Sequence, residues 1–139
     1  MALKQVFVDT SYVYALINPN DQWHARAVTC QETLAAENRL LITSEFVLTE
    51  IADGLSAIAF REAASLTIRL FQSRRDVEIV AASPSLFSDG LNLFENRLDK
   101  TWGLTDCISF VIMQEYEIFE SLTADDHFRQ AGFRALLLE

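Results

Sequence analysis

Short apolar runs alternate with longer segments of helical periodicity along this chain, and that alternation limits the fold more than any other feature. The first run, Val6-Phe7-Val8, contains two β-branched residues and is typical of a buried strand. Because helical segments separate such runs, the fold class is predicted to be α/β, with a parallel sheet covered by helices on both faces. The predicted strands cover residues 4–9, 40–43, 77–81, 118–122 and 133–138.

The predicted helices begin at recognisable capping residues. Ser44 is the expected N-cap of a helix that runs to about residue 59, and Ser83-Pro84 places a cap and an N1 proline at another helix. Residues 60–73 either continue the helix from Ser44 or bend away from it near Phe60. Further helices are expected over residues 21–37 and from residue 104, where the sequence is apolar on most sides. In the helix after Pro84, the residues expected to face the core are Phe87, Leu91, Phe94 and Leu98.

The length and composition indicate a single domain over residues 1–139. Half of the 139 residues are hydrophobic, which is enough for a full core. No apolar run reaches the roughly 18 residues that a membrane span needs, and no signal peptide is recognisable, so we expect a cytoplasmic protein without a membrane segment. Cys30 and Cys107 match no metal or redox motif, which suits buried, reduced thiols.

The net charge of −9 bears on the class of ligand. Contacts to phosphate need lysine and arginine, so a strongly acidic chain is a poor general binder of nucleic acid. Two bound divalent ions would add four positive charges, bring the net charge from −9 to −5 and reverse the local sign at their site. The acidity therefore weighs against a nucleic-acid substrate without excluding it.

Four carboxylates occupy comparable places in the predicted fold: Asp9, Glu50, Asp106 and Asp125. Asp9 and Asp125 each follow an apolar strand run, whereas Glu50 and Asp106 lie in the first turns of predicted helices. Strand ends of a parallel sheet meet at one edge, where ligands bind, and a site made only of carboxylates suits a hard divalent cation better than zinc. Each acid also has a structural explanation as a helix cap or a partner of the helix dipole. Asp126 competes with Asp125 for the last position.

Four motifs in this order resemble the PIN-domain ribonucleases, and especially the small single-domain toxins of the VapC type. The motifs are Val8-Asp9-Thr10-Ser11, residues 44–50, residues 104–109 and residues 123–128. The resemblance covers nearly the whole chain and implies a three-layer α/β/α sandwich with a mainly parallel five-stranded sheet. It also implies Mg²⁺ or Mn²⁺ bound by four acids: Asp9, Glu50, Asp106 and Asp125 (or Asp126). The hydroxyls of Thr10 or Ser11 and of Thr105 are implied to support these ligands through hydrogen bonds.

The same resemblance implies the activity and the partners. A chain of this kind is expected to cut single-stranded RNA internally, to form a homodimer and to be inhibited by a small antitoxin. We expect the helical hairpin over residues 51–73 to provide the surface for the dimer or the antitoxin. His24 and His127 are not expected to transfer protons, and His127 is expected to support its loop. Candidate cations for the RNA phosphates, each of which also fits a solvated face, are Arg61, Arg69, Arg74, Arg75, Arg97 and Lys100.

Two other hypotheses stay open. The chain could be a PIN-like module that binds or assembles without catalysis, which its acidity favours, although all four acids are intact. Alternatively, it could be an aspartate-based phosphatase with Asp9 as the nucleophile. A D-x-D pattern is typical of such enzymes, whereas the second residue after Asp9 is Ser11.

Overall fold

The computed structural model describes residues 4–139 and confirms the predicted fold class. Over these residues the sheet has five strands in the order β3-β2-β1-β4-β5, and each neighbouring pair is parallel. Strand β1 is the central strand. Its residues Val6, Phe7 and Val8 are fully buried because helices cover both faces of the sheet. The strands are β1 (Gln5–Val8), β2 (Leu40–Ser44), β3 (Val77–Val80), β4 (Glu120–Leu122) and β5 (Arg134–Ala135).

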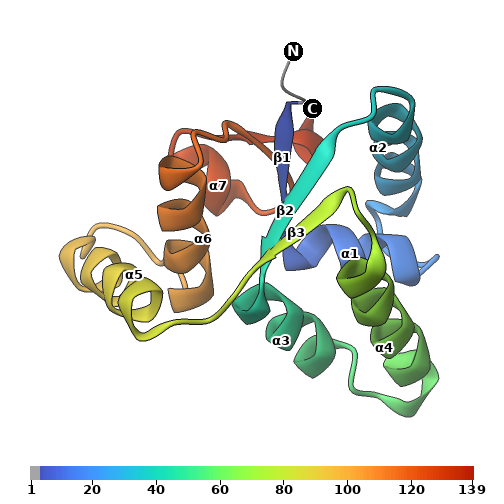
Figure 1. Ribbon diagram of the computed structural model, residues 1–139, viewed down its shortest axis with the longest axis horizontal. Helices are drawn as coiled ribbons and strands as arrows, with labels where there is room; N and C mark the ends of the chain where they lie inside the picture. Colours follow the sequence, from blue (N-terminus) through green and yellow to red (C-terminus); the bar gives the residue numbers. More distant parts are fainter. Residues whose placement is uncertain (1–3) are drawn as a thin grey trace.

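The helices complete a three-layer α/β/α sandwich (Figure 1). Helix α3 leaves β2 directly, at the carboxyl edge of the sheet (Figure 1). None of the helices over residues 4–139 has the length and apolar character needed to cross a membrane. On one face lie α1 (Thr10–Ile17), α2 (His24–Ala36) and α4 (Ile58–Ser73), on the other lie α5 (Pro84–Asn96), α6 (Leu104–Glu115) and α7 (Asp126–Gln130), and α3 spans Glu45–Gly54.

The carboxyl ends of β1, β2 and β4 meet along one edge of the sheet. The backbone N–H of Asp9 donates to the carbonyl of Leu122 at 3.1 Å, which extends the pairing of β1 with β4 to the ends of both strands. Ser44 ends β2 and caps α3, as expected, by accepting a hydrogen bond from the N–H of Val47 at 3.2 Å. The edge therefore brings together the starts of α1 and α3 and the loop between β4 and α7.

Helix α6 is buried, as its sequence predicts. Phe110 on α6 packs edge-on against Phe128 of α7 at 4.9 Å and against Trp102 at 5.0 Å, measured between ring centroids. Such aromatic pairs each add about 0.5–1.5 kcal/mol beyond their area burial. These contacts hold α7 in a fixed position against α6. The apolar α6 side chains that are at most 1% exposed are Cys107, Ile108, Phe110, Ile112 and Met113.

Two predicted boundaries are wrong. The closing strand, expected over residues 133–138, contains only two residues and is followed by a 3₁₀ turn over Leu136–Leu138. Leu136 and Leu137 are both buried, so the chain turns to bury neighbouring leucines that an extended strand would place on opposite faces. The helix expected to end near residue 59 ends at Gly54, and α4 begins separately at Ile58 after an extended Ala57.

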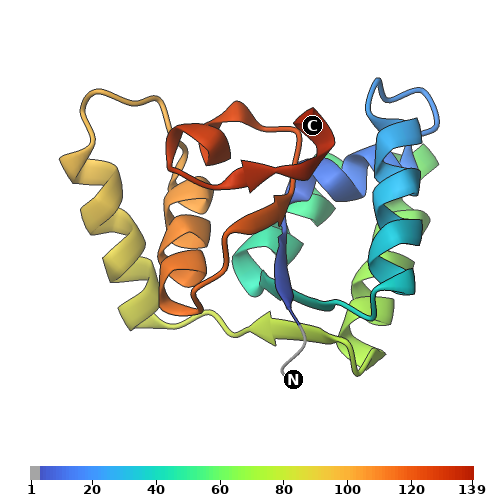
Figure 2. The same ribbon diagram turned by 90° about the horizontal axis from the view of Figure 1, so that it is seen from above.

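The predicted core-facing stripe of α5 is also wrong. Phe87, Phe94 and Leu98 are 43%, 47% and 93% exposed, whereas Leu86 and Gly90 are buried. Helix α5 lies outside α6 and packs mainly on that helix, not on the sheet (Figure 2). Gly90 permits this close packing, because a Cβ there would lie 2.3 Å from Cγ1 of Ile108.

Candidate metal centre

Asp9 lies between β1 and α1 with its side chain turned into the protein. The residue is 4% exposed, and its carboxylate makes no capping hydrogen bond to α1, so the simple explanation of Asp9 as a helix cap is wrong. Its Oδ2 atom accepts hydrogen bonds from the hydroxyls of Thr123 at 2.7 Å and Ser11 at 3.1 Å. Burial raises the pKa of Asp9 to about 7; the Thr123 hydrogen bond opposes the rise and the negative charge of Asp106 adds to it.

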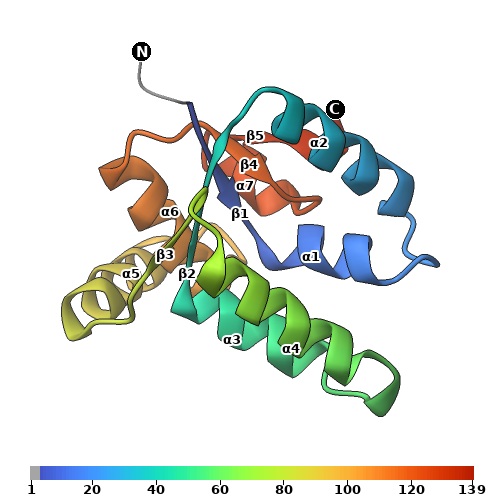
Figure 3. The ribbon, with the colours of Figure 1, turned by 45° about the vertical axis from the view of Figure 1, so that its right-hand side comes forward.

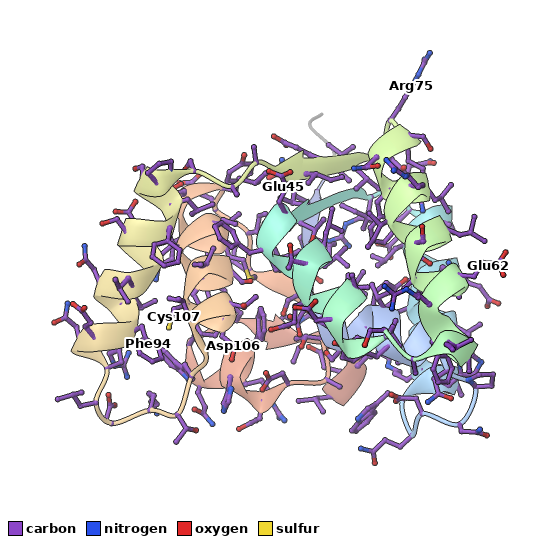
Figure 4. All side chains as sticks on the ribbon, turned by 90° about the horizontal axis from the view of Figure 1, so that it is seen from below. Glu45, Glu62, Arg75, Phe94, Asp106 and Cys107 are labelled. Carbon is purple, nitrogen blue, oxygen red and sulfur yellow. The ribbon has the colours of Figure 1, made fainter. Side chains whose placement is uncertain are left out.

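Asp106 is in the first turn of α6, as expected, on the side of that helix toward α3 (Figure 4). Its Oδ2 atom accepts hydrogen bonds from the N–H of Gly103 at 3.2 Å and from Nδ1 of His127 at 3.0 Å. Burial raises the pKa of the Asp106 carboxyl, and the charge of Asp125 raises it further, while the hydrogen bond from His127 lowers it. Asp106 is therefore close enough to Asp9 and to Asp125 for the negative charges to interact.

The structure separates Asp125 from Asp126. Asp125 caps α7 by accepting a hydrogen bond from the N–H of His127 at 2.9 Å, and its Oδ1 lies 3.4 Å from Nδ1 of His127. One potential ligand atom from each of Asp106, Asp125 and His127 lies within 4.8 Å of the others. The side chain of Asp126 is 63% exposed and contacts Arg129 at 3.6 Å. The cap geometry thus turns Asp125, and not Asp126, toward Asp106.

Glu50 reaches the same edge through α3, and like Asp9 it lies outside that compact group. Its Oε1 atom accepts a hydrogen bond from the hydroxyl of Thr10, the neighbour of Asp9, at 2.5 Å. The hydroxyl of Tyr14 donates to the Glu50 carbonyl at 2.9 Å, in space left by Gly54, where a Cβ would lie 1.7 Å from the Tyr14 oxygen. Glu50 also lines a groove of about 550 Å³ together with Thr105 and the acids Glu45 and Asp53.

Thr123 is a residue of this site that the sequence analysis missed. Its buried hydroxyl donates to Asp9, lies 3.0 Å from the Ser11 hydroxyl and accepts from the N–H of Asp125 at 3.0 Å. Thr123 therefore ties the end of β1 to the loop that carries Asp125. A hydroxyl residue directly after β4, two residues before Asp125, was the available signal.

Several of the cations proposed for RNA are already engaged. Arg74 pairs with Asp76 at 2.5 Å, and Arg97 pairs with Asp99 at 3.0 Å. Arg75 lies just after the end of α4, and its side chain points away from the protein, far from Asp106 (Figure 4). A role for Arg74 or Arg97 in binding phosphate therefore requires an existing ion pair to open.

The oxygen donors of the four acids suit a divalent cation, although only Asp106 and Asp125 belong to the compact group with His127. Within residues 4–139, no lysine or arginine forms an ion pair with any of them. In residues 4–139, the side-chain donors to Asp9, Glu50 and Asp106 each reach a single oxygen of the carboxylate, and the N–H of Gly103 reaches the same oxygen of Asp106 as His127. The N–H of His127 likewise reaches only Oδ1 of Asp125. The second oxygens remain available as the hard ligands that Mg²⁺ and Mn²⁺ prefer.

This fold, with unpaired acids at the carboxyl edge of a parallel sheet, is the arrangement expected of a PIN domain. The family model of the PIN domain matches residues 6–134, and the chain therefore belongs to that family. Its structural neighbours are VapC toxins. No curated protein matches the sequence.

Two solved structures show how extensive the likeness is. The chain is similar to VapC20 from Mycobacterium tuberculosis, a sarcin–ricin loop cleaving toxin, with 25% identity and a TM-score of 0.80 over 92% of this chain and 95% of that one. It is also similar in fold to VapBC2 from Rickettsia felis, solved with a DNA fragment from its promoter. There the identity is 19% and the TM-score is 0.68, over 94% of this chain and 96% of that one. Family and neighbours together support a nuclease role within a toxin–antitoxin pair.

Proposed function

We propose that this chain is a metal-dependent endoribonuclease that cleaves single-stranded RNA and acts as the toxin of a toxin–antitoxin pair. The observation that carries the proposal is the buried carboxylate of Asp9 beside Asp106, which forms no ion pair with a lysine or arginine of residues 4–139. An isolated buried charge is costly without a partner, and a divalent cation is the partner that these oxygens suit. The description of VapC20 as a sarcin–ricin loop cleaving toxin supports the substrate class.

Each acid has a role in this proposal. Bound there, Mg²⁺ or Mn²⁺ supplies positive charge that offsets charge developing on the phosphoryl oxygens and lowers the pKa of the attacking water. Thr123 and Ser11 hold one oxygen of Asp9, so the carboxylate keeps its orientation when RNA enters. Thr10 orients Glu50 in the same way. We assign Asp125, not Asp126, as the fourth acid.

RNA cleavage tests this assignment. The wild-type protein should cut single-stranded RNA with Mn²⁺ or Mg²⁺, leave 5′-phosphate and 3′-hydroxyl ends, and stop cutting in EDTA. Asp9→Asn and Asp125→Asn should abolish cutting while the protein stays folded, whereas Asp126→Asn serves as the matched control and should retain it. Full cutting by Asp9→Asn would refute the proposal, and a folded wild-type protein that never cuts RNA would favour the non-catalytic hypothesis.

A groove on the other side of the sheet supports an antitoxin partner. It has a volume of about 590 Å³ and is lined mainly by residues of α1, α2 and α4. Figure 3 shows these three helices together on one side of the sheet. Apolar side chains such as Leu16, Val28 and Phe71 line it, and Arg39 and Arg74 add charge. We propose that an apolar helix of the antitoxin occupies this groove, because VapBC2 is itself a two-component complex.

Paired substitutions on α4 test the groove. Leu70 is 52% exposed and lines it, whereas Leu66 is 62% exposed on the same helix but is not among the lining residues. The candidate antitoxin is the product of a neighbouring short reading frame, and it should co-purify with the wild-type chain. Leu70→Asp should abolish this co-purification, and Leu66→Asp should not. Equal retention by both variants would contradict this location. Light scattering tests the expected homodimer, which should have twice the chain mass of 15.7 kDa.

A further inference from the structure

His127 joins two acids that come from different elements. It is the second residue of α7, and its side chain is 28% exposed. Its Nδ1 atom lies 3.0 Å from Oδ2 of Asp106, across 21 positions of sequence, and 3.4 Å from Oδ1 of Asp125. A histidine that only supported its own loop would have no need of the contact to α6.

The hydrogen-bond chemistry defines which nitrogen does what. An ionised carboxylate can only accept, so Nδ1 of His127 must carry a hydrogen to bond Asp106. In the neutral ring Nε2 is then an acceptor, and the hydroxyl of Thr101 lies 3.4 Å from it. Both ring nitrogens are therefore held: Nδ1 by Asp106 at the start of α6, and Nε2 by Thr101 in the loop before α6.

The same assignment argues against His127 as a metal ligand. The nitrogen that faces the acids carries a hydrogen and has no lone pair to give, and the other nitrogen faces Thr101. What the ring does is occupy Oδ2 of Asp106 together with the N–H of Gly103, which leaves Oδ1 as the oxygen available to a cation. Without His127, the carboxylate would keep only the 3.2 Å bond from Gly103 and could rotate.

The backbone beneath His127 is rigid enough for this task. The next residue, Phe128, is fully buried and packs against Phe110 of α6 at 4.9 Å and Phe7 of β1 at 6.4 Å between ring centroids. The base of the His127 side chain is thus fixed relative to α6 by residues other than His127 itself. Truncating the imidazole should consequently leave the fold intact.

We propose that His127 is a positioning residue: its Nδ1–H orients the Asp106 carboxylate for binding a divalent cation, and it does not bind the cation itself. The proposal rests on the proposed function, because it assumes that Asp106 is a ligand. Hydrogen-bond partners of metal ligands typically account for about 10–100-fold in metal affinity.

Three substitutions at one position test the role of Nδ1. The amide nitrogen of asparagine can take the place of Nδ1, that of glutamine takes the place of Nε2, and alanine removes both. Mn²⁺ binding is measured by electron paramagnetic resonance titration of each folded variant. His127→Ala and His127→Gln should weaken Mn²⁺ binding by about 10–100-fold, and His127→Asn should restore most of that loss.

RNA cleavage as a function of Mn²⁺ concentration is the second readout. A positioning defect should be overcome by mass action, so His127→Ala should approach the wild-type kcat at saturating Mn²⁺. Unchanged Mn²⁺ affinity in His127→Ala would overturn the proposal. A loss in His127→Asn equal to that in His127→Ala would overturn it too, and would indicate a direct ligand.

Failure of the proposed function looks different. A wild-type protein that binds Mn²⁺ with His127-dependent affinity but does not cut RNA would refute the nuclease assignment and leave the positioning role standing. A wild-type protein that binds no Mn²⁺ would overturn both. Thr101→Val is the matched control for the ring orientation, and its effect should be smaller than that of His127→Ala because its contact is longer, at 3.4 Å.

Discussion

Replacing Asp9 with asparagine should stabilise the metal-free protein at neutral pH while abolishing RNA cleavage. Asp9 is 4% exposed, and burial raises its pKa from 3.8 to about 7, so the folded protein disfavours the charged carboxylate. Asparagine keeps an oxygen that can accept the hydrogen bonds from Thr123 and Ser11 but carries no charge. The substitution therefore removes the electrostatic cost and retains the contacts.

The pKa difference sets the size and sign of the effect. Between about pH 4 and pH 7 the native protein holds a proton that the unfolded chain has lost, so the wild-type free energy of unfolding falls as the pH rises. A rise from 3.8 to about 7 corresponds to about 4 kcal/mol once the pH exceeds the folded-state pKa. We expect Asp9→Asn to recover up to about that amount at pH 8, and almost none at about pH 3.5, where Asp9 is mostly protonated in the native state.

Urea unfolding followed by circular dichroism, in EDTA and over a range of pH, measures both proteins. The difference between Asp9→Asn and wild type should grow with pH. A variant that is less stable than wild type at pH 8, or a difference that does not change with pH, would refute the reasoning. Adding Mn²⁺ should stabilise the wild type more than the variant, because binding to the native state alone raises the free energy of unfolding.

Three further changes probe the scaffold, each measured by urea unfolding. Glu120 is 6% exposed; burial alone would raise its pKa, but hydrogen bonds from Lys4 and Arg39 outweigh burial and lower it. Glu120→Gln should cost about 2–3 kcal/mol at pH 7, and the difference should disappear as acid protonates the wild-type carboxyl; a cost independent of pH would contradict the ion pairs. Phe110→Ala should cost about 3–5 kcal/mol by leaving a cavity between α6 and α7, and a loss below that of a surface control would contradict its central packing. Ser44→Ala should lower the free energy of unfolding by about 1 kcal/mol because the cap of α3 is lost. Ser44→Asp should keep most of the capping stabilisation, because aspartate can also accept the hydrogen bond.

Local signals were sufficient where a single element carries the information. The apolar run that ends at Asp9 and the cap at Ser44 mark the elements correctly, and the apolar sequence after Asp106 predicts a buried α6. Periodicity was insufficient for α5, since residues three and four apart define several possible faces. The face that is buried depends on Gly90 and its close approach to Ile108.

The sequence by itself determined the α/β alternation and the presence of acids at strand ends and helix starts, because strand propensity, capping and apolar periodicity are local properties. Only the tertiary structure shows how the neighbours Asp125 and Asp126 differ, because Asp125 caps α7 close to Asp106 whereas the side chain of Asp126 lies exposed beside Arg129. Only the tertiary structure, too, brought the Thr123 hydroxyl to Asp9, 114 positions away, and His127 to Asp106. Contacts across such separations leave no periodic trace in the chain, since they depend on parallel strands ending at one edge.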